Sequence, residues 1–281
     1  MAAFTFQVNL DRLSKSQQAI ANYVAGALAQ IPYCTDEEIA GKVGVSTATV
    51  SRFWRAIGYA NLKDFKKRLL ESEHATPARK VKHILSEVEQ ESADIVDKLT
   101  ELASSNLAVT AKRVERAQFE GAVDAIHRAE TVYLYGGGAS ACLTELMRFR
   151  LNRIGIRAVC MASSGSELLE TMAHAGPGDT VLLLGFVRRT PELAVLLDYS
   201  REAGYTTVLL TDLLVSEMLE QSDYALRLDR GELEGFHSLT APVAILEALI
   251  VGVTQRRGRQ ALDKLEKLHA LRKRYAAQLP K

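Results

Sequence analysis

The chain has 281 residues, of which 47% are hydrophobic and 25% are charged. This length fits two ordinary domains, and the mean hydropathy of -0.03 is that of a globular protein rather than a disordered, fibrous or membrane chain. The longest apolar stretch, Leu239 to Val253, contains Glu247 and is shorter than the ~20 residues that cross a bilayer. The N-terminus lacks a secretory signal pattern, and three scattered cysteines form neither a disulfide framework nor a CxxC metal site. We therefore expect a cytoplasmic protein with no metal and no cofactor.

The net charge of +1 conceals three blocks of different sign. Residues 1–77 carry a net charge of +2, residues 78–254 carry -8 and residues 255–281 carry +7. Within the first block, residues 46–70 hold six Lys and Arg residues against Asp64 alone. Such a local cluster of positive charge attracts a polyanion even when the whole chain is nearly neutral.

The first quarter of the chain shows apolar residues at helical spacing and no strand-like alternation. Capping boxes start helices at Ser14 and Thr35, and the second of these helices is expected to stop at Gly44, which tolerates the left-handed conformation of a tight turn. The pattern predicts a third helix from Ser46 to Gly58. Its expected buried stripe consists of Val50, Phe53, Trp54 and Ile57.

A helix, a short glycine-containing turn and a second helix form the motif that lays its second helix in a DNA major groove. Arginine forks pair with guanine edges or phosphates, and short hydroxyl side chains let the backbone approach phosphate oxygens. The next helix, capped by Asn61, adds lysines expected to face the DNA backbone. The predicted DNA-binding residues are Ser46, Thr47, Ala48, Thr49, Ser51, Arg52, Arg55, Lys63, Lys66 and Lys67. The alternative is an antiparallel helix pair in a small bundle with a solvated charged face.

The run from Leu13 to Leu70 resembles the N-terminal domain of the RpiR/MurR family of bacterial transcription regulators. The matching segments are Glu38-Ile39-Ala40, Gly44-Val45-Ser46, Ala48-Thr49-Val50, Arg52-Phe53, Ile57-Gly58-Tyr59 and Leu62-Lys63-Asp64-Phe65-Lys66. Members of this family join a helix-turn-helix to a C-terminal sugar isomerase (SIS) domain. The resemblance therefore implies a SIS-like second domain that supplies dimer contacts.

From residue 130 onward, short apolar strands alternate with helices, which is typical of βαβ units around a parallel sheet. The predicted strands are 131–135, 157–161, 180–187, 206–211 and 224–228, and the predicted helices are 140–153, 165–175, 191–203, 214–221 and 242–253. The expected fold class is α/β: an N-terminal all-helical helix-turn-helix domain, then an αβα sandwich with a parallel sheet, SIS-like. The predicted divisions are a DNA-binding domain at 1–77, a linker of one or two helices at 78–116, a SIS-like effector-binding and dimerisation domain at 117–254, and a basic C-terminal helix at 255–281.

Ligands of parallel sheets bind beyond the carboxyl ends of the strands. The first turn there contains Gly136, Gly137, Gly138 and Ser140, whose backbone N–H groups and hydroxyl suit a phosphate. The turn also satisfies the GxGxxA pattern of dinucleotide sites, but the second strand is not followed by the acidic residue such a site requires. The loop matches the SIS family pattern G-x-G-x-S. A glycine turn needed only for chain reversal is the alternative.

The second turn departs from the family pattern. SIS domains usually hold a sugar phosphate there with a Ser-x-Ser-Gly-x-Thr loop, of which only Thr190 is present, while Arg188 and Arg189 replace the small residues. Arginine binds phosphate or carboxylate bidentately, so the sequence still allows an anionic ligand, in a different geometry. The alternative is that both arginines are solvated or form salt bridges.

Two further groups complete the predicted effector site. Ser163 and Ser164, with Ser166 nearby, follow the second strand, although serines before a helix are also ordinary caps. Glu234, with Glu232 and His237, follows the last strand, where the resemblance places the glutamate base and histidine of SIS isomerases. The predicted effector-binding residues are Gly136, Gly137, Gly138, Ser140, Ser163, Ser164, Arg188, Arg189, Thr190 and Glu234.

The sequence thus favours a transcription regulator of carbohydrate metabolism over an enzyme. We expect it to bind a palindromic operator in double-stranded DNA as a homodimer or homotetramer, because one helix-turn-helix reads only one half-site. Its effector is expected to be a small anion, such as a sugar phosphate or a related acid. The basic C-terminal helix is expected to pack on its own domain or a partner subunit, with DNA or membrane contact as the alternative. The alternative functions are an aldose-ketose phosphate isomerase with an accessory helical domain and a DNA-bound structural dimer without a ligand.

Overall fold

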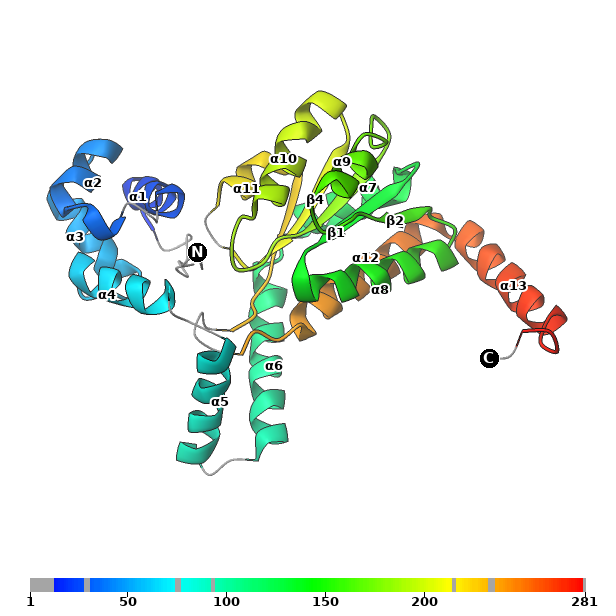
Figure 1. The fold of residues 1–281 in the computed structure, drawn as a ribbon, viewed down its shortest axis with the longest axis horizontal. Helices are drawn as coiled ribbons and strands as arrows, with labels where there is room; N and C mark the ends of the chain where they lie inside the picture. The colour runs from blue at the N-terminus through cyan, green and yellow to red at the C-terminus, as the bar shows by residue number, and fades with distance from the viewer. Residues whose placement is uncertain are drawn as a thin grey trace.

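The computed structural model describes residues 13–27, 31–73, 77–91, 94–213, 216–231 and 236–279. A helical N-terminal part and a larger α/β part are joined by two long helices (Figure 1). This arrangement confirms the expected fold class. No helix in the part of the chain that the structure describes is long and apolar enough to cross a membrane.

The N-terminal part consists of short helices around one apolar core. Its elements are α1 (Lys15–Gly26), a 3-10 turn (Ile31–Tyr33), α2 (Asp36–Val43), α3 (Thr47–Ala56) and α4 (Leu62–Glu73). Both predicted capping boxes are present, at Ser14 with Gln17 and at Thr35 with Glu38. Leu28, which the sequence pattern assigned to the first helix, lies outside the described residues.

The linker consists of two helices, α5 (Pro77–Glu91) and α6 (Ile95–Arg113). They are separate because Asp94 caps the second one, accepting a hydrogen bond from the backbone N–H of Val96 at 2.7 Å. The α6 helix packs against α12 of the α/β part, so the end of the linker belongs to the α/β body.

The α/β part is built on a five-stranded, fully parallel sheet with the strand order β2-β1-β3-β4-β5. Its strands are β1 (Val132–Gly136), β2 (Ala158–Cys160), β3 (Thr180–Leu184), β4 (Thr206–Thr211) and β5 (Tyr224–Arg227). Its helices are α7 (Arg116–Arg128), α8 (Ala141–Arg153), α9 (Ser166–Met172), α10 (Pro191–Ala203), α11 (Glu217–Gln221), α12 (Thr240–Arg257) and α13 (Arg259–Arg274), with a 3-10 turn at Gly138–Ser140. The chain leaves β1 toward β2 on one side and returns to β3 on the other, so the order of the strands reverses between β1 and β3.

Helices cover both faces of the sheet and make an αβα sandwich (Figure 1). On β1, Leu134 packs in a core with α7, α8 and α12, whereas its neighbours Tyr133 and Tyr135 pack in a second core with α9, α10 and α11. Adjacent strand residues point to opposite faces, so a strand buried on both sides is apolar throughout. This explains why β3 reads as an unbroken apolar run.

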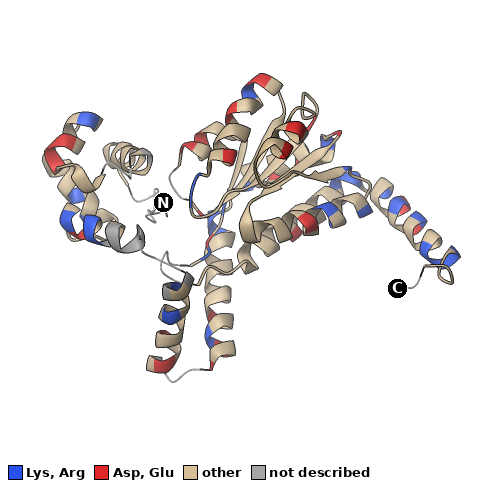
Figure 2. Ribbon diagram, in the orientation of Figure 1, with Lys and Arg blue, Asp and Glu red and all other residues tan. Residues whose placement is uncertain are grey.

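Several element boundaries differ from the sequence prediction. The clearest differences are the end of the third strand and the start of the basic C-terminal helix, which was expected at residue 255, whereas α12 continues to Arg257 and α13 begins at Arg259. The third strand ends at Leu184 rather than at residue 187, because the chain turns away from the sheet before Val187, whose φ is 68°. The C-terminal basic helix is α13, whose Ala261 is buried against the main core while Leu262 and Leu271 remain exposed. Figure 2 shows Lys and Arg along α13, and acidic residues on α9, α10 and α11, which cover the other face of the sheet.

Candidate DNA-binding face and ligand pocket

The turn between α2 and α3 has the geometry of a helix-turn-helix. Gly44 has a φ of 74° and closes α2, and its N–H donates to the carbonyl of Ala40. Two residues later Ser46 caps α3, accepting from the backbone N–H of Thr49 at 3.2 Å. Glycine adopts this left-handed conformation without strain, so α3 can start directly after a tight turn.

The α3 helix buries one face and exposes the other. Val50, Phe53 and Trp54 are fully buried, as the sequence pattern predicted, whereas Ile57, the fourth predicted member, caps the end of the helix and is only partly buried. Of the predicted DNA-binding residues, Ser46, Thr47, Ala48, Ser51, Arg52, Arg55, Lys63 and Lys67 are exposed, while Thr49 and Lys66 are partly buried. The side chain of Arg52 lies along the helix, because its Nε donates to the carbonyl of Ala48 at 3.1 Å.

A pocket of about 440 Å³ opens at the carboxyl ends of β1 and β3. The loops after these strands lie side by side, because Gly136 and Leu184 are register partners in the parallel pair. This is the point at which the strand order reverses, where sheets of this type bind their ligands. Seven predicted effector residues line the pocket: Gly137, Gly138, Ser140, Ser163, Ser164, Arg188 and Thr190. The further lining residues are Tyr135, Leu184, Phe186, Val187, Glu192 and Leu193.

The turn at residues 136–140, called the glycine loop below, is shaped by close packing. A Cβ added to Gly136 would lie 3.0 Å from the backbone oxygen of Ser140, so only glycine fits there without a shift of the chain. Gly138 has a φ of 57° and begins the short 3-10 turn. Gly136 therefore shapes the loop without itself lining the pocket, and Ser140 is buried at its base.

The loop between β3 and α10, residues 185–190, is called the arginine loop below, and its two arginines have different contacts. Arg188 lines the pocket. Arg189 is not among the lining residues, since its guanidinium binds the carboxylate of Glu217 at 2.8 Å and the amide oxygen of Gln221 at 3.3 Å, both on α11. Thr190 caps α10 through a 3.4 Å contact from the N–H of Leu193. Glu234, the remaining predicted effector residue, lies outside the described residues.

Val187 stands out in this loop, because it is the one non-glycine residue with a positive φ in the described part of the chain. A β-branched residue is strained in this conformation and needs neighbours that hold it. Its N–H donates to the Oδ1 atom of Asp212 at 2.7 Å, and the other carboxylate oxygen of Asp212 lies 3.3 Å from Arg230. Burial raises the pKa of Asp212, while the Val187 N–H and the Arg230 charge oppose that rise.

Sequence reasoning missed several residues of the pocket wall. Tyr135 and Phe186 were not among the predicted effector residues, although both line the pocket. The Tyr135 hydroxyl donates to the carbonyl of Ser163 at 3.1 Å and so joins β1 to the loop after β2. Burial raises the pKa of Tyr135. The available signal was an aromatic residue directly before each of the two loops or within it. Asp212 and Arg230 gave no such signal, because each simply follows a strand.

A larger hollow of about 830 Å³ lies at the opposite ends of β1 and β3. Glu130, Glu167, Glu170 and Asp179 line it, so its potential is unfavourable for an anion. The first turn of α9 borders this hollow but presents the acidic side chain of Glu167 there, and the glycine loop after β1 is not among its lining residues. The smaller pocket is therefore the better candidate for an anion site.

Two family models match the chain. The rpiR-family helix-turn-helix domain matches residues 4–76, and the SIS domain matches residues 125–252. The chain therefore carries an rpiR-family helix-turn-helix domain and a SIS domain. The matched regions cover the helix-turn-helix and nearly the whole parallel sheet with its pocket, so the family resemblance seen in the sequence is confirmed.

Named relatives agree with this assignment. An HTH-type transcriptional regulator of Haemophilus influenzae, described as uncharacterized, is 29% identical over 76% of this chain and 75% of its own length. HexR, an HTH-type transcriptional regulator of Escherichia coli, is 25% identical over 93% of this chain and 91% of its own. The solved Vibrio vulnificus NanR protein complexed with ManNAc-6P has a TM-score of 0.59 at 21% identity and covers 97% of each chain, which supports the fold. The chain is therefore a transcriptional regulator with an rpiR-family helix-turn-helix domain and a SIS domain.

Proposed function

We propose that this regulator binds a two-fold symmetric DNA site through α3 and that a sugar phosphate in the pocket between β1 and β3 changes its affinity for that site. The observation that carries the proposal is the lining of the pocket. A glycine loop, three serines and Arg188 line one small space at the reversal point of the sheet.

The glycine and arginine loops fit the phosphate group of such a ligand. Backbone N–H groups around Gly137 and Gly138 can approach phosphate oxygens closely, since neither residue carries a side chain. Arg188 offers the fork that binds phosphate bidentately. This donor set replaces the hydroxyl-lined loop of the family pattern and supports an anion held in a different geometry.

Another residue of the pocket lining fits the sugar. Glu192 lines the pocket, and a carboxylate there would repel a second phosphate but accept hydrogen bonds from sugar hydroxyls. NanR, the structural neighbour, was solved with ManNAc-6P, a ligand of this class. The pocket volume of about 440 Å³ falls in the range of small-molecule sites.

The proposed role is regulation rather than turnover. Among the described residues that line the pocket there is no histidine, and the carboxylate is that of Glu192 alone. An isomerase needs a base placed against an anchored substrate. Turnover of a hexose 6-phosphate by the purified protein, lost in Glu192→Gln, would favour the isomerase alternative instead.

The two adjacent arginines, Arg188 and Arg189, allow a direct test of the proposed ligand site. Thermal unfolding is measured with glucose 6-phosphate, fructose 6-phosphate, N-acetylmannosamine 6-phosphate, gluconate 6-phosphate and inorganic phosphate. At least one sugar phosphate should raise the Tm, because a ligand that binds the folded state stabilises it. Arg188→Ala should weaken this stabilisation, whereas Arg189→Ala should retain it because its guanidinium binds α11. Equal stabilisation in Arg188→Ala, or none by any anion, would contradict the proposed site.

A further inference from the structure

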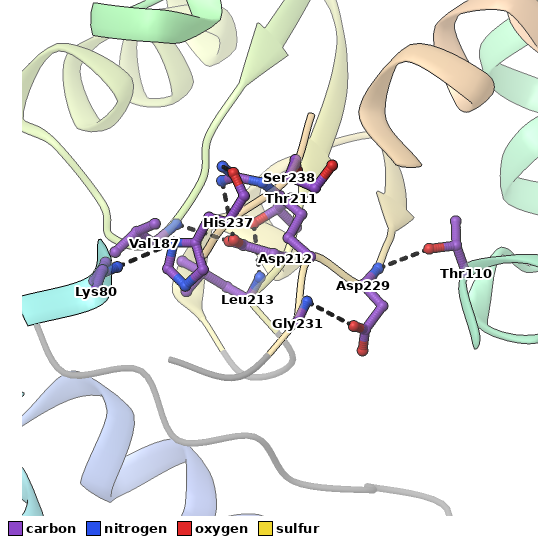
Figure 3. A network of polar contacts seen from close by, with 11 residues as sticks. Lys80, Thr110, Val187, Thr211, Asp212, Leu213, Asp229, Gly231, His237 and Ser238 are labelled. Carbon is purple, nitrogen blue, oxygen red and sulfur yellow. Dashed lines mark hydrogen bonds and ion pairs between the residues drawn. The ribbon is translucent and has the colours of Figure 1, made fainter. Parts of the chain in front are cut away.

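The segment after β5 contains a buried arginine that contacts three parts of the α/β domain. Arg230 is only 8% exposed. Its guanidinium donates to the carbonyls of Ser238 at 3.1 Å and His237 at 3.3 Å, and its third contact is the carboxylate of Asp212 at 3.3 Å. Figure 3 shows that Asp212, His237 and Ser238 lie close together. A buried guanidinium with fixed partners holds the segments around it in one arrangement.

On one side, this arginine supports the pocket wall. Its guanidinium stacks over the ring of Phe186 at 4.6 Å from the ring centroid, and Phe186 lines the pocket. Asp212, its ion-pair partner, accepts from the N–H of Val187 and so holds the strained residue next to Arg188. A change in the Phe186–Arg188 segment therefore alters the surroundings of the Asp212–Arg230 pair.

On the other side, the same cluster reaches the linker. The Nζ of Lys80, on α5, lies 3.2 Å from Nδ1 of His237, whose carbonyl accepts from Arg230. Burial and the nearby charge of Arg230 lower the pKa of Lys80, which agrees with its place beside the pair. Three residues separate the end of α4 in the DNA-binding domain from the start of α5.

The second linker helix is attached to the same segment. Thr110 on α6 accepts from the N–H of Asp229, and Arg113 on α6 forms an ion pair with the Asp229 carboxylate at 2.5 Å. Asp229 and Arg230 are consecutive, so one contacts α6 while the next contacts the pocket loop. The α6 attachment fixes this segment in the α/β body, and the Lys80–His237 contact joins it to α5 on the side of the N-terminal part.

We propose that the Asp212–Arg230 pair is a coupling element that positions the pocket loop and transmits the position of that loop, through His237 and Lys80, to α5 and the DNA-binding domain. This inference deepens the proposed function, on which it rests, by naming the residues that would carry its regulation. The pair has a positioning role and does not itself contact DNA.

A double-mutant cycle in the ligand-free full-length protein tests the coupling. Phe186→Leu keeps an apolar side chain but removes the ring face beneath Arg230. Amide hydrogen exchange over residues 77–91 should become about tenfold faster in this variant, because α5 loses part of its support. Lys80→Met should produce a similar increase, and the double variant should show little more than either alone. In the Lys80→Arg background, unlike Lys80→Met, Phe186→Leu should again accelerate exchange over residues 77–91, because arginine keeps a donor for His237.

Lys82→Met is the matched control, since Lys82 is exposed on the same helix. In that background, Phe186→Leu should still accelerate exchange over residues 77–91. The coupling is overturned if Phe186→Leu leaves this exchange unchanged, or if its full effect persists in Lys80→Met.

Measurements of DNA affinity with and without fructose 6-phosphate distinguish a failure of this inference from a failure of the proposed function. If fructose 6-phosphate changes the DNA affinity of the wild type, Lys80→Met should still bind it but should lose that change. Retention of the full DNA response in Lys80→Met would overturn the coupling. If fructose 6-phosphate does not bind the wild type, that ligand is removed from the proposed effectors, and the exchange cycle decides the coupling by itself.

Discussion

The indole nitrogen of Trp54 donates a hydrogen bond to the carboxylate of Asp36 at 2.8 Å. Trp54 lies on α3 and Asp36 is the first residue of α2, so this bond joins the two helices of the helix-turn-helix. The indole is fully buried and stacks near Phe53 and Phe65. The angle at which α3 is presented to DNA therefore depends on this polar contact as well as on apolar packing.

Replacement of Asp36 by alanine should lower the free energy of unfolding by about 1–3 kcal/mol, because the buried indole N–H loses its acceptor. Glu37→Ala is the control, since Glu37 is an exposed acid in the same first turn and has a comparable effect on the helix dipole. Urea unfolding of both variants provides the measurement. Equal destabilisation by the two substitutions would show that the bond to Trp54 contributes nothing of its own.

The exposed arginines of α3 are predicted to read DNA. Arg52→Ala and Arg55→Ala should each weaken binding to a selected site by about 1–3 kcal/mol if they contact base edges, and should relax specificity at one position. Fluorescence anisotropy with the selected duplex and with a scrambled duplex measures both effects. Arg201→Ala, an exposed substitution on α10, should leave the affinity unchanged. Unchanged affinity in both α3 variants would remove these arginines from the interface.

The lysines of α4 are predicted to contact phosphates rather than bases. Lys63→Ala, Lys66→Ala and Lys67→Ala should weaken binding to all duplexes alike. Each substitution should reduce the slope of log affinity against log salt concentration by about 1, because one phosphate contact releases about one counterion. Titrations at several salt concentrations supply the slopes. Slopes equal to that of the wild type would place these lysines away from the DNA backbone.

The two adjacent glycines of the pocket loop should respond differently to alanine. Gly136→Ala brings a Cβ to 3.0 Å from the backbone of Ser140, so we expect a loss of about 1–3 kcal/mol of stability and weaker ligand binding. Gly137→Ala should be tolerated, because the nearest atom to its Cβ would be the Tyr135 hydroxyl at 3.7 Å and its φ is -84°. Thermal unfolding of both variants compares them directly. A larger loss in Gly137→Ala would contradict this account of the loop.

Local patterns predicted most of the secondary structure. The capping boxes at Ser14 and Thr35, the turn at Gly44 and the buried stripe of α3 all follow from residues close in sequence, and the structure contains each of them. The bounds of β4 and α10 agree with the prediction because a clear change of periodicity separates them. The predicted contacts of the exposed α3 side chains with DNA stay predictions.

Long-range contacts explain what the sequence did not reveal. The two arginines after β3 look equivalent in sequence, yet Arg189 binds α11 while Arg188 lines the pocket, and this difference depends on the position of Glu217 in the fold. The backbone of Val187 is left-handed, and Asp212, 25 residues later, accepts a hydrogen bond from its N–H. Arg230 is similar, since its partners come from separate segments and no local pattern marks a buried arginine.

Selection of duplexes from a random library tests the central claim most directly. The full-length wild type should enrich a two-fold symmetric sequence, and the double variant Arg52→Ala, Arg55→Ala should fail to enrich it, because these arginines would contact the bases. Addition of the sugar phosphate that stabilises the protein should change the amount of the enriched duplex that is bound. Enrichment of no sequence by the wild type, or of the same sequence to the same extent by the double variant, would contradict the account.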